Sequence, residues 1–443
     1  MESKSTKVST GNESLAVEAT TSVQSPRAAI QFQKPTRVRV WLVTILFITL
    51  FVAYLDRVNI SVLIANPQFL RDMGLTRNPV GQGLLMTFFL IAYGIGNVLL
   101  SPTGDRFGPR KTMCIALVAW TVPVVMAATA KTLVVLYVSR FLLGLGEAMH
   151  YPMLVAFVKN WFPIQERGRA NSAWILGQML GIAVAMPIFS MIVVGCGWRA
   201  IFWVCAVCGA ALIPIVWFFT ADRPEQSRWT NQAEVEYIAK GQKIETERQE
   251  KGIQPSTAWR NAIVLMTDLN FCCSAVSYYA SVTAWWGLVT WLPQYLRIAR
   301  GFSWAQMGVF ASLPFVVGTI AIIIAGFLAD RFKRSAPLIG IGLAGTALFI
   351  LMGAFVHNAY LSACLISVAM FFKGLMQPMS WSVVQAIASA KMVGQATGLQ
   401  NGSAQIIGSM SPVIMGFLIS ITGTYTAGLM YLVGFGYSGE GER

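Results

Sequence analysis

Long apolar runs, separated by short polar stretches, follow one another along most of this chain. A helix needs about 20 consecutive apolar residues to cross the hydrocarbon core of a bilayer. The pattern therefore predicts an all-α polytopic membrane protein. We expect spanning helices at twelve segments: 41–63, 80–102, 112–130, 133–157, 171–194, 199–220, 264–292, 305–328, 336–356, 359–387, 393–421 and 425–437.

The last segment, 425–437, is too short to cross about 30 Å as a helix. The chain then ends in the polar sequence SGEGER. We therefore expect a truncated twelfth helix, with charged residues at an awkward depth.

Composition agrees with a membrane protein. Hydrophobic residues make up 55% of the chain and charged residues 12%, whereas soluble domains carry about 25% charged residues. The net charge of +14 first suggests a nucleic-acid partner, but the Lys and Arg residues are unevenly distributed among the loops. Alternate loops and both termini hold 24 of the 33, and the intervening loops hold six. Cytoplasmic loops typically carry more Lys and Arg than external loops. The distribution therefore predicts that both termini are cytoplasmic, and it explains the positive charge without a nucleic-acid partner.

The polar stretches divide the chain. Residues 1–40 are rich in Ser and Thr, and we expect a disordered cytoplasmic tail. Residues 221–260 form the longest later polar stretch, which predicts a cytoplasmic linker with a short surface helix after Asn231. The linker separates a six-helix bundle at 41–220 from a second one at 261–443, whose last helix is incomplete.

A loop sequence occurs once in each half. Asp105 lies in SPTGDRFGPRKT, and Asp330 lies in AGFLADRFKRSA, 225 residues later. Matching loops in matching halves indicate the parallel repeats of secondary transporters, related by a pseudo-two-fold axis.

Three charged residues lie deep within the first and fourth spans: Asp56, Arg57 and Glu147. A charge at the bilayer centre costs about 2.5–3.5 kcal/mol on insertion scales, so it is usually functional. Neighbours on a helix point about 100° apart, so Asp56 and Arg57 need separate partners. Arg57 is either the anchor for an anionic substrate, because a guanidinium matches a carboxylate well, or one side of an interhelical ion pair with Glu147.

The two acids are candidates for proton coupling. Burial in a low-dielectric site favours the protonated form of a carboxyl, and a nearby cation opposes it. Anion binding near Asp56 or Glu147 can therefore be linked to proton binding. The alternative is that one acid is only the counter-ion of Arg57 or Arg140.

Several motifs resemble a known family. The two loops match the loop motif of the major facilitator superfamily. The matching residues are Asp105, Arg106, Gly108 and Lys111 in the first loop, where Ser101 replaces the first Gly of the motif, and Gly326, Leu328, Asp330 and Arg331 in the second. Other matching segments are Tyr54 with Asp56 and Arg57, Arg140 to Ala148, Trp161 to Ala170, and Trp291 to Pro293. Within that superfamily the chain resembles the anion:cation symporters, which include galactonate, glucarate and phthalate transporters.

The resemblance implies import of a small organic anion with protons by alternating access. It implies substrate-binding roles for Arg57, Tyr54, Tyr93, Gln178, Tyr278 and Asn401, and proton-coupling roles for Asp56 and Glu147. The loop motifs also predict gates, formed by Asp105, Arg106, Arg140, Asp330 and Arg331, in which Asp105 pairs with Arg140 or Arg169 across the cytoplasmic face. The amides of Gln178 and Asn401 either bind substrate hydroxyls or hold helices together. Galactonate-type members carry a Gln near Tyr278, so an aromatic or less hydroxylated acid stays open.

Lys373 lies near the middle of the tenth span, with Gln377 and Trp381 on the same face. It either binds a second carboxylate, which favours a dicarboxylate substrate, or extends toward the interface or pairs with an acid. We favour the second interpretation.

Taken together, these features predict a monomeric, multi-pass transporter of a bacterial inner membrane. We expect no cofactor and no metal, with H⁺ as the coupling ion and a small organic carboxylate as the substrate. A polytopic membrane enzyme is the alternative from another class, but no metal motif or nucleophile-base pair is found in the spans. A ligand sensor that does not transport is a third.

Overall fold

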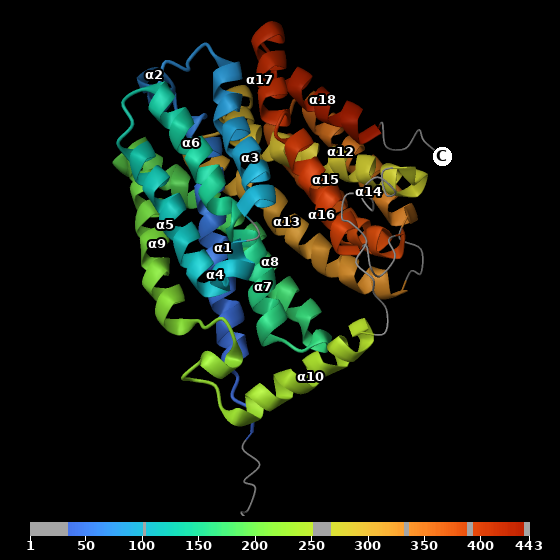
Figure 1. Ribbon diagram of the computed structural model, residues 1–443. Coiled ribbons are helices and arrows are strands. Elements are labelled where there is room, and N and C mark those ends of the chain that lie inside the picture. Colours follow the sequence, from blue (N-terminus) through green and yellow to red (C-terminus); the bar gives the residue numbers. More distant parts are fainter. Residues whose placement is uncertain (1–33, 101–102, 251–266, 332–335, 388–392, 438–443) are drawn as a thin grey trace, which may run out of the picture. The chain divides into compact units, whose positions relative to one another are not determined.

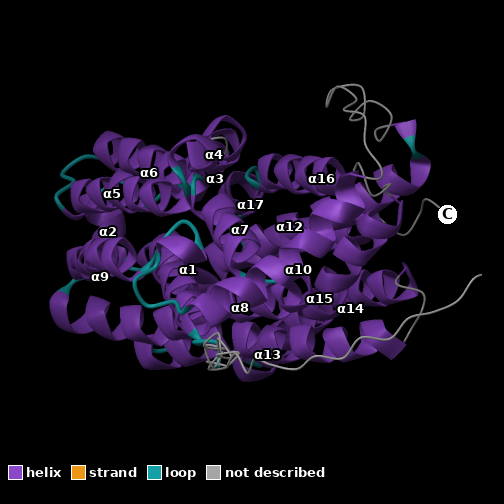
Figure 2. Ribbon diagram, turned by 60° about the horizontal axis from the view of Figure 1, so that its bottom comes forward, coloured by secondary structure: helices purple, strands orange, loops and turns teal. Residues whose placement is uncertain are grey.

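The computed structural model describes residues 34–100, 103–250, 267–331, 336–387 and 393–437. Within these ranges all regular structure is helical, as Figure 2 shows. The first half contains α1 (Val38–Leu63), α2 (Pro67–Asp72), α3 (Pro79–Leu100), α4 (Thr103–Phe107), α5 (Pro109–Ala128), α6 (Leu133–Ala148), α7 (His150–Trp161), α8 (Ile164–Cys196) and α9 (Trp198–Phe219). A short 3₁₀ turn, Pro224–Gln226, and α10 (Gln232–Glu250) follow. The second half contains α12 (Leu269–Gln294), a π-helical turn (Tyr295–Ala299), α13 (Trp304–Arg331), α14 (Ala336–Phe355), α15 (Ala359–Ile387), α16 (Val393–Gly408), α17 (Ser411–Thr422) and α18 (Tyr425–Tyr437).

The expected spans are found as helices, with most ends within a few residues of the expected ones. Among the described residues, ten helical segments are long and apolar enough to cross a membrane. The seventh expected span, α12, and the short last one, α18, are not among the ten. The fold is therefore that of an all-α polytopic membrane protein.

Two expected spans are each divided into two helices. The fourth span breaks at Met149, and the eleventh breaks after Gly408. Each break lies three or four residues before a proline, Pro152 or Pro412. Proline has no N–H for the helical hydrogen bond and collides with the carbonyl four residues earlier, which accounts for both interruptions.

Helices of the first half pack mainly against one another, as do those of the second half. In the first half α1 packs on α8 and α9, while α5 packs on α6 and α9; in the second, α15 packs on α13 and α14. The halves meet where α8 packs on α13, α3 on α16 and α17, and α1 on α12. Figure 1 shows α10 and α2 at opposite ends of the helices, and these are named the α10 end and the α2 end.

The halves make close contacts at the α2 end. A methyl group on Gly83 of α3 would meet the backbone carbonyl of Pro412 in α17, and one on Gly416 of α17 would meet the carbonyl of Pro79. Two hydrogen bonds cross the same region: Gln294 Nε2 donates to Gln82 Oε1 (3.0 Å), and the Thr87 hydroxyl donates to the Ser409 carbonyl (2.8 Å). The glycines allow the helices to approach closely, so the α2 end is closed.

Replacing Gly83 by alanine is expected to open the α2 end. The added methyl overlaps a backbone atom that has no rotamer to change, and such overpacking costs about 1–3 kcal/mol. Pulsed electron paramagnetic resonance between spin labels on α3 and α17 should show a longer distance. Gly195→Ala is the control, because nothing lies within 4 Å of a methyl group there. Identical distance distributions in all three proteins would show that the close packing does not hold this end closed.

The linker helix α10 is attached to the start of α1 by a buried carboxylate. Glu234, which is fully buried, accepts hydrogen bonds from the Thr36 hydroxyl (2.5 Å), the Val38 amide (3.3 Å) and Arg39 Nη1 (2.9 Å). The Asn231 side chain accepts from the Glu234 amide (3.0 Å) and so caps α10. The surface helix expected after Asn231 is thus present, and Glu234 connects it to α1.

Glu234→Ala is expected to detach α10 from α1. Removing the carboxylate removes three hydrogen bonds to residues 36–39, each contributing about 1.5–3 kcal/mol. Arg39 keeps its ion pair with Glu166 (3.0 Å), so the loss comes from the contacts of α10. Hydrogen exchange should become faster at residues 36–39 and along α10. The control is Glu236→Ala, which removes an exposed acid of the same helix whose described hydrogen bond is to Gln232 (3.2 Å). Equal exchange in the two variants would mean that Glu234 does not hold the helix.

Candidate functional site

A cavity of about 180 Å³ lies where the two halves meet. Its lining comes from α1, α3, α7 and α8 on one side and from α12, α15 and α16 on the other. All six residues to which the resemblance assigns substrate binding line this one space: Tyr54, Arg57, Tyr93, Gln178, Tyr278 and Asn401. The other lining residues are Asn97, Tyr151, Ile175, Ser281, Val282, Trp285, Trp286, Lys373, Gln377 and Gln405.

Arg57 faces this cavity and is also one side of an ion pair. Its Nε lies 2.6 Å from Oε2 of Glu147, and both side chains are almost completely buried, at 2% and 0% exposure. Its guanidinium carbon lies 4.6 Å from the ring centroids of both Tyr54 and Tyr93. Nη2 has no hydrogen-bond partner among the described residues. The ion pair therefore exists, and Nη2 is a donor with no partner in the described part of the chain.

Asp56 lies away from the cavity, as expected for the neighbour of Arg57 on a helix. It is fully buried, and neither of its carboxylate oxygens has a hydrogen bond of ordinary geometry to a described residue. Glu147, Arg140 and Cys205 are the groups that act most strongly on its charge. The adjacent acid and base thus have different surroundings, as the helical geometry predicted.

Arg140, one of the two expected partners of Asp105, lies inside the helical bundle in this structure. Its side chain is 1% exposed and lies halfway along α6. Its guanidinium donates to the backbone carbonyl of Asp56 (3.2 Å) and to Oδ1 of Asn59 (3.2 Å). The reason is positional: two turns into a helix, the side chain reaches the neighbouring helix α1 rather than the loop.

The other expected gates can be described only in part. Arg106 is exposed and lies over the ring of Phe107, 5.5 Å from its centroid. The side chains of Asp105, Asp330 and Arg331 lie outside the part of the chain that the structure describes.

In the second half, polar groups on α12 and α16 meet at the cavity wall. The Tyr278 hydroxyl donates to Oδ1 of Asn401 (3.2 Å), and Trp286 Nε1 donates to Oε1 of Gln405 (3.0 Å). Asn401 therefore holds two helices together and lines the cavity as well. The two functions that the sequence left open for this amide are compatible.

Lys373 also lines the cavity, contrary to the interpretation favoured from the sequence. Its Nζ donates to Oε1 of Gln377 (3.0 Å) and lies 4.1 Å from the ring centroid of Trp285. The side chain is 6% exposed and has no ion pair with a described acid. Its ammonium group is therefore held by Gln377 and Trp285 and by no described carboxylate. The sequence did contain a signal for this position, because Gln377 lies one helical turn further on the same face and provides a polar partner for Lys373.

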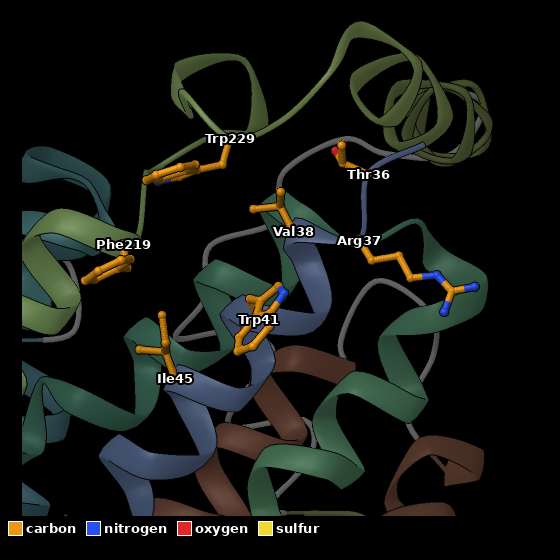
Figure 3. A pocket seen from close by; sticks show the side chains of 7 residues that line it. All are labelled: Thr36, Arg37, Val38, Trp41, Ile45, Phe219 and Trp229. Atoms are coloured by element: carbon orange, nitrogen blue, oxygen red, sulfur yellow. The ribbon is translucent and has the colours of Figure 1, made fainter. Parts of the chain in front are cut away.

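A wider hollow, of about 460 Å³, lies at the α10 end beside the start of α1. Figure 3 shows Trp41 and Ile45 of α1, Phe219 of α9 and Trp229 around it, while the Arg37 side chain extends away. Trp41 is 72% exposed. This apolar surface directs no charged side chain inward, so it does not suit an anion.

Comparisons with known proteins agree on one family. The sequence model described as "Major Facilitator Superfamily" matches residues 46–412. A probable sulfoacetate transporter of Cupriavidus necator is 33% identical over 386 residues, which cover 85% of this chain and 86% of the relative. A probable galactarate/D-glucarate transporter of Escherichia coli is 28% identical, with 92% of each chain covered. A D-galactonate transporter of Escherichia coli is 27% identical, with 90% of this chain and 93% of the relative covered.

Two solved structures share the fold. A bacterial homologue of the human lysosomal transporter Spinster, in an inward-facing and occupied conformation, has a TM-score of 0.70 at 16% identity and covers 87% of this chain and 83% of that one. A D-xylose-proton symporter has a TM-score of 0.68 at 14% identity and covers 90% of this chain and 97% of that one.

Proposed function

The chain belongs to the major facilitator superfamily, and we propose that it imports a small organic anion together with protons. It is a multi-pass membrane transporter and not an enzyme. What stays a proposal is the substrate class, the coupling ion, the direction of transport and the residues that perform each step. We also propose that it acts as a monomer, since both sides of the described cavity lining belong to the two halves of one chain.

The observation that carries the proposal is the position of Arg57. Its guanidinium lies in a cavity between the two halves, with one nitrogen on Glu147 and another without a partner among the described residues. Planar donors of this kind bind carboxylates and similar anions well. The relatives named above as transporters of sulfoacetate, galactarate, glucarate and galactonate all carry organic acids. We assign the anion's first acidic group to Arg57, and its hydroxyls or other polar atoms to Tyr54, Tyr93, Gln178, Tyr278 and Asn401.

The ion pair between Arg57 and Glu147 gives proton coupling a physical basis. A proton on Glu147 neutralises the carboxylate that pairs with Arg57. The guanidinium then has no counter-ion in this pair, and its attraction for the anionic substrate increases. Asp56, beside Arg140, is the second candidate proton carrier. Because the two carboxylates interact with the same cluster of cations, proton binding to either changes the field at the cavity.

The closed α2 end supports transport by alternating access. The excess of Lys and Arg favours a cytoplasmic α10 end, so the contacts between α3 and α17 close the outer side. In the outward-facing state these contacts separate, and the loops that hold Asp105, Arg106, Asp330 and Arg331 come together as the inner gate. The cell location proposed is the bacterial inner membrane.

Uptake by proteoliposomes tests the function. The purified full chain is reconstituted and given labelled sulfoacetate, glucarate or galactonate under an inward proton gradient. We expect accumulation of at least one of them above its external concentration, and a protonophore should abolish that accumulation. Binding in the absence of any uptake would indicate a sensor instead. Uptake at the same rate and to the same level with and without the proton gradient would refute the coupling to protons.

A further inference from the structure

The two halves each contribute one cation to the same cavity. Arg57 enters from α1 and Lys373 from α15, and both line a space of about 180 Å³. A molecule that fills this space therefore contacts side chains from both halves, with one cation on each side.

Their charges are balanced unequally. Within the cluster of the first half, the carboxylates of Asp56 and Glu147 act on the guanidiniums of Arg57 and Arg140. This cluster thus supplies one carboxyl group for each guanidinium. Lys373 has no ion pair with an acid in the described ranges, so its positive charge is left over.

The environment of Lys373 holds the ammonium in place without neutralising it. Gln377 accepts one of its three N–H donors, and the face of Trp285 lies under the charge at 4.1 Å. The Trp285 ring is itself fixed by an edge contact with Phe315, with centroids 5.5 Å apart. The face of an aromatic ring attracts a cation electrostatically, so Trp285 positions the ammonium without supplying a counter-ion. A buried cation without a counter-ion is costly and marks a functional site in a membrane protein.

From this juxtaposition we propose that the substrate is a short dianion, with one acidic group at Arg57 and the second at Lys373. The inference rests on the proposed function and specifies its substrate class. When a proton neutralises Glu147, the cavity has two uncompensated positive charges, one on each side. A molecule with two carboxylates, or one carboxylate and one sulfonate, matches both of them.

The test compares pairs of acids that differ only in the second charge. The pairs are succinate with 4-hydroxybutyrate, tartrate with threonate, and 3-sulfopropanoate with 3-hydroxypropanesulfonate. Affinity for the purified full chain is measured by calorimetry, and proton-driven uptake is measured in proteoliposomes. In the wild type we expect at least one dianion to bind at least tenfold more tightly than its partner.

Lys373 variants then locate the preference. In Lys373→Gln we expect the ratio of affinities within that pair to fall to between one and two. Lys373→Arg should keep most of the ratio. The control is Lys131→Gln, which removes an exposed charge from the turn between α5 and α6.

The outcomes separate this inference from the proposed function. Equal affinities within every pair in the wild type, or an unchanged ratio in Lys373→Gln, would overturn the dianion site. If the variants do not fold, the affinities of the wild type for the two members of each pair still test the preference for a dianion. Proton-driven uptake of monoanions without uptake of any dianion would refute the inference and leave the proposed function standing. If none of the six acids binds or is carried, and sulfoacetate, glucarate and galactonate are not carried either, both fail.

Discussion

Arg57→Ala is expected to reduce organic-anion uptake on the order of 100-fold. The guanidinium offers two charge-assisted hydrogen bonds to an acidic group, each contributing about 1.5 kcal/mol, and their sum corresponds to roughly two factors of ten. Arg57→Lys keeps the charge but not the planar pair of donors, so we expect a smaller loss, near tenfold. Initial rates of uptake into proteoliposomes, with substrate affinity from calorimetry, measure both effects.

A second variant separates binding from stability. Arg57→Ala leaves the Glu147 carboxylate buried without its partner, which costs about 3–5 kcal/mol of folding stability. In the double variant Arg57→Ala/Glu147→Gln no buried charge is left at that position. We expect it to recover the thermal stability of the wild type and still fail to bind substrate. If Arg57→Ala binds the anion as tightly as the wild type, the anchor assignment is wrong.

Glu147→Gln is expected to uncouple transport from the proton gradient. The glutamine side chain accepts a hydrogen bond from Arg57 Nε but carries no proton in the physiological range. A pH difference of about two units can drive on the order of 100-fold accumulation for each coupled proton. In the variant the accumulation ratio should fall to about one, while exchange of labelled for unlabelled substrate across the membrane continues.

The exchange measurement is the internal control, because a misfolded protein loses both activities. Asp56→Asn tests the second acid in the same assay. The two acids have different surroundings, Glu147 on Arg57 and Asp56 near Arg140 and Cys205. Loss of accumulation in only one variant would therefore identify the carrier. If both variants accumulate substrate like the wild type, neither acid carries the coupled proton.

Much of the fold could be predicted because the signal is local. The length of each apolar run sets the length of a spanning helix, and observed helices such as Trp198–Phe219 and Ala359–Ile387 begin and end close to the expected residues. The breaks at Met149 and after Gly408 were missed, although Pro152 and Pro412 are visible in the sequence. Their effect on the backbone is local as well, so the signal was available.

The candidate site was predicted less completely. The helical angle between Asp56 and Arg57 correctly separated their surroundings, and the resemblance supplied six residues that line one cavity. The hydrogen bond from Arg140 to Asn59 was not predicted, because a residue number does not tell which neighbouring helix a side chain faces. The same holds for Lys373, whose aromatic partner Trp285 is on a different helix.

By itself, the sequence determined the helices, their order, the membrane environment and the presence of costly charges within the spans. Each of these depends on residues close together in the chain. The tertiary structure decided which charges meet: Arg57 with Glu147, 90 residues apart, and Lys373 with Trp285 across α15 and α12. It also decided that Lys373 shares a cavity with Arg57. These pairings depend on how the helices pack around one another, because a buried charge finds its partner across the bundle and not along its own helix.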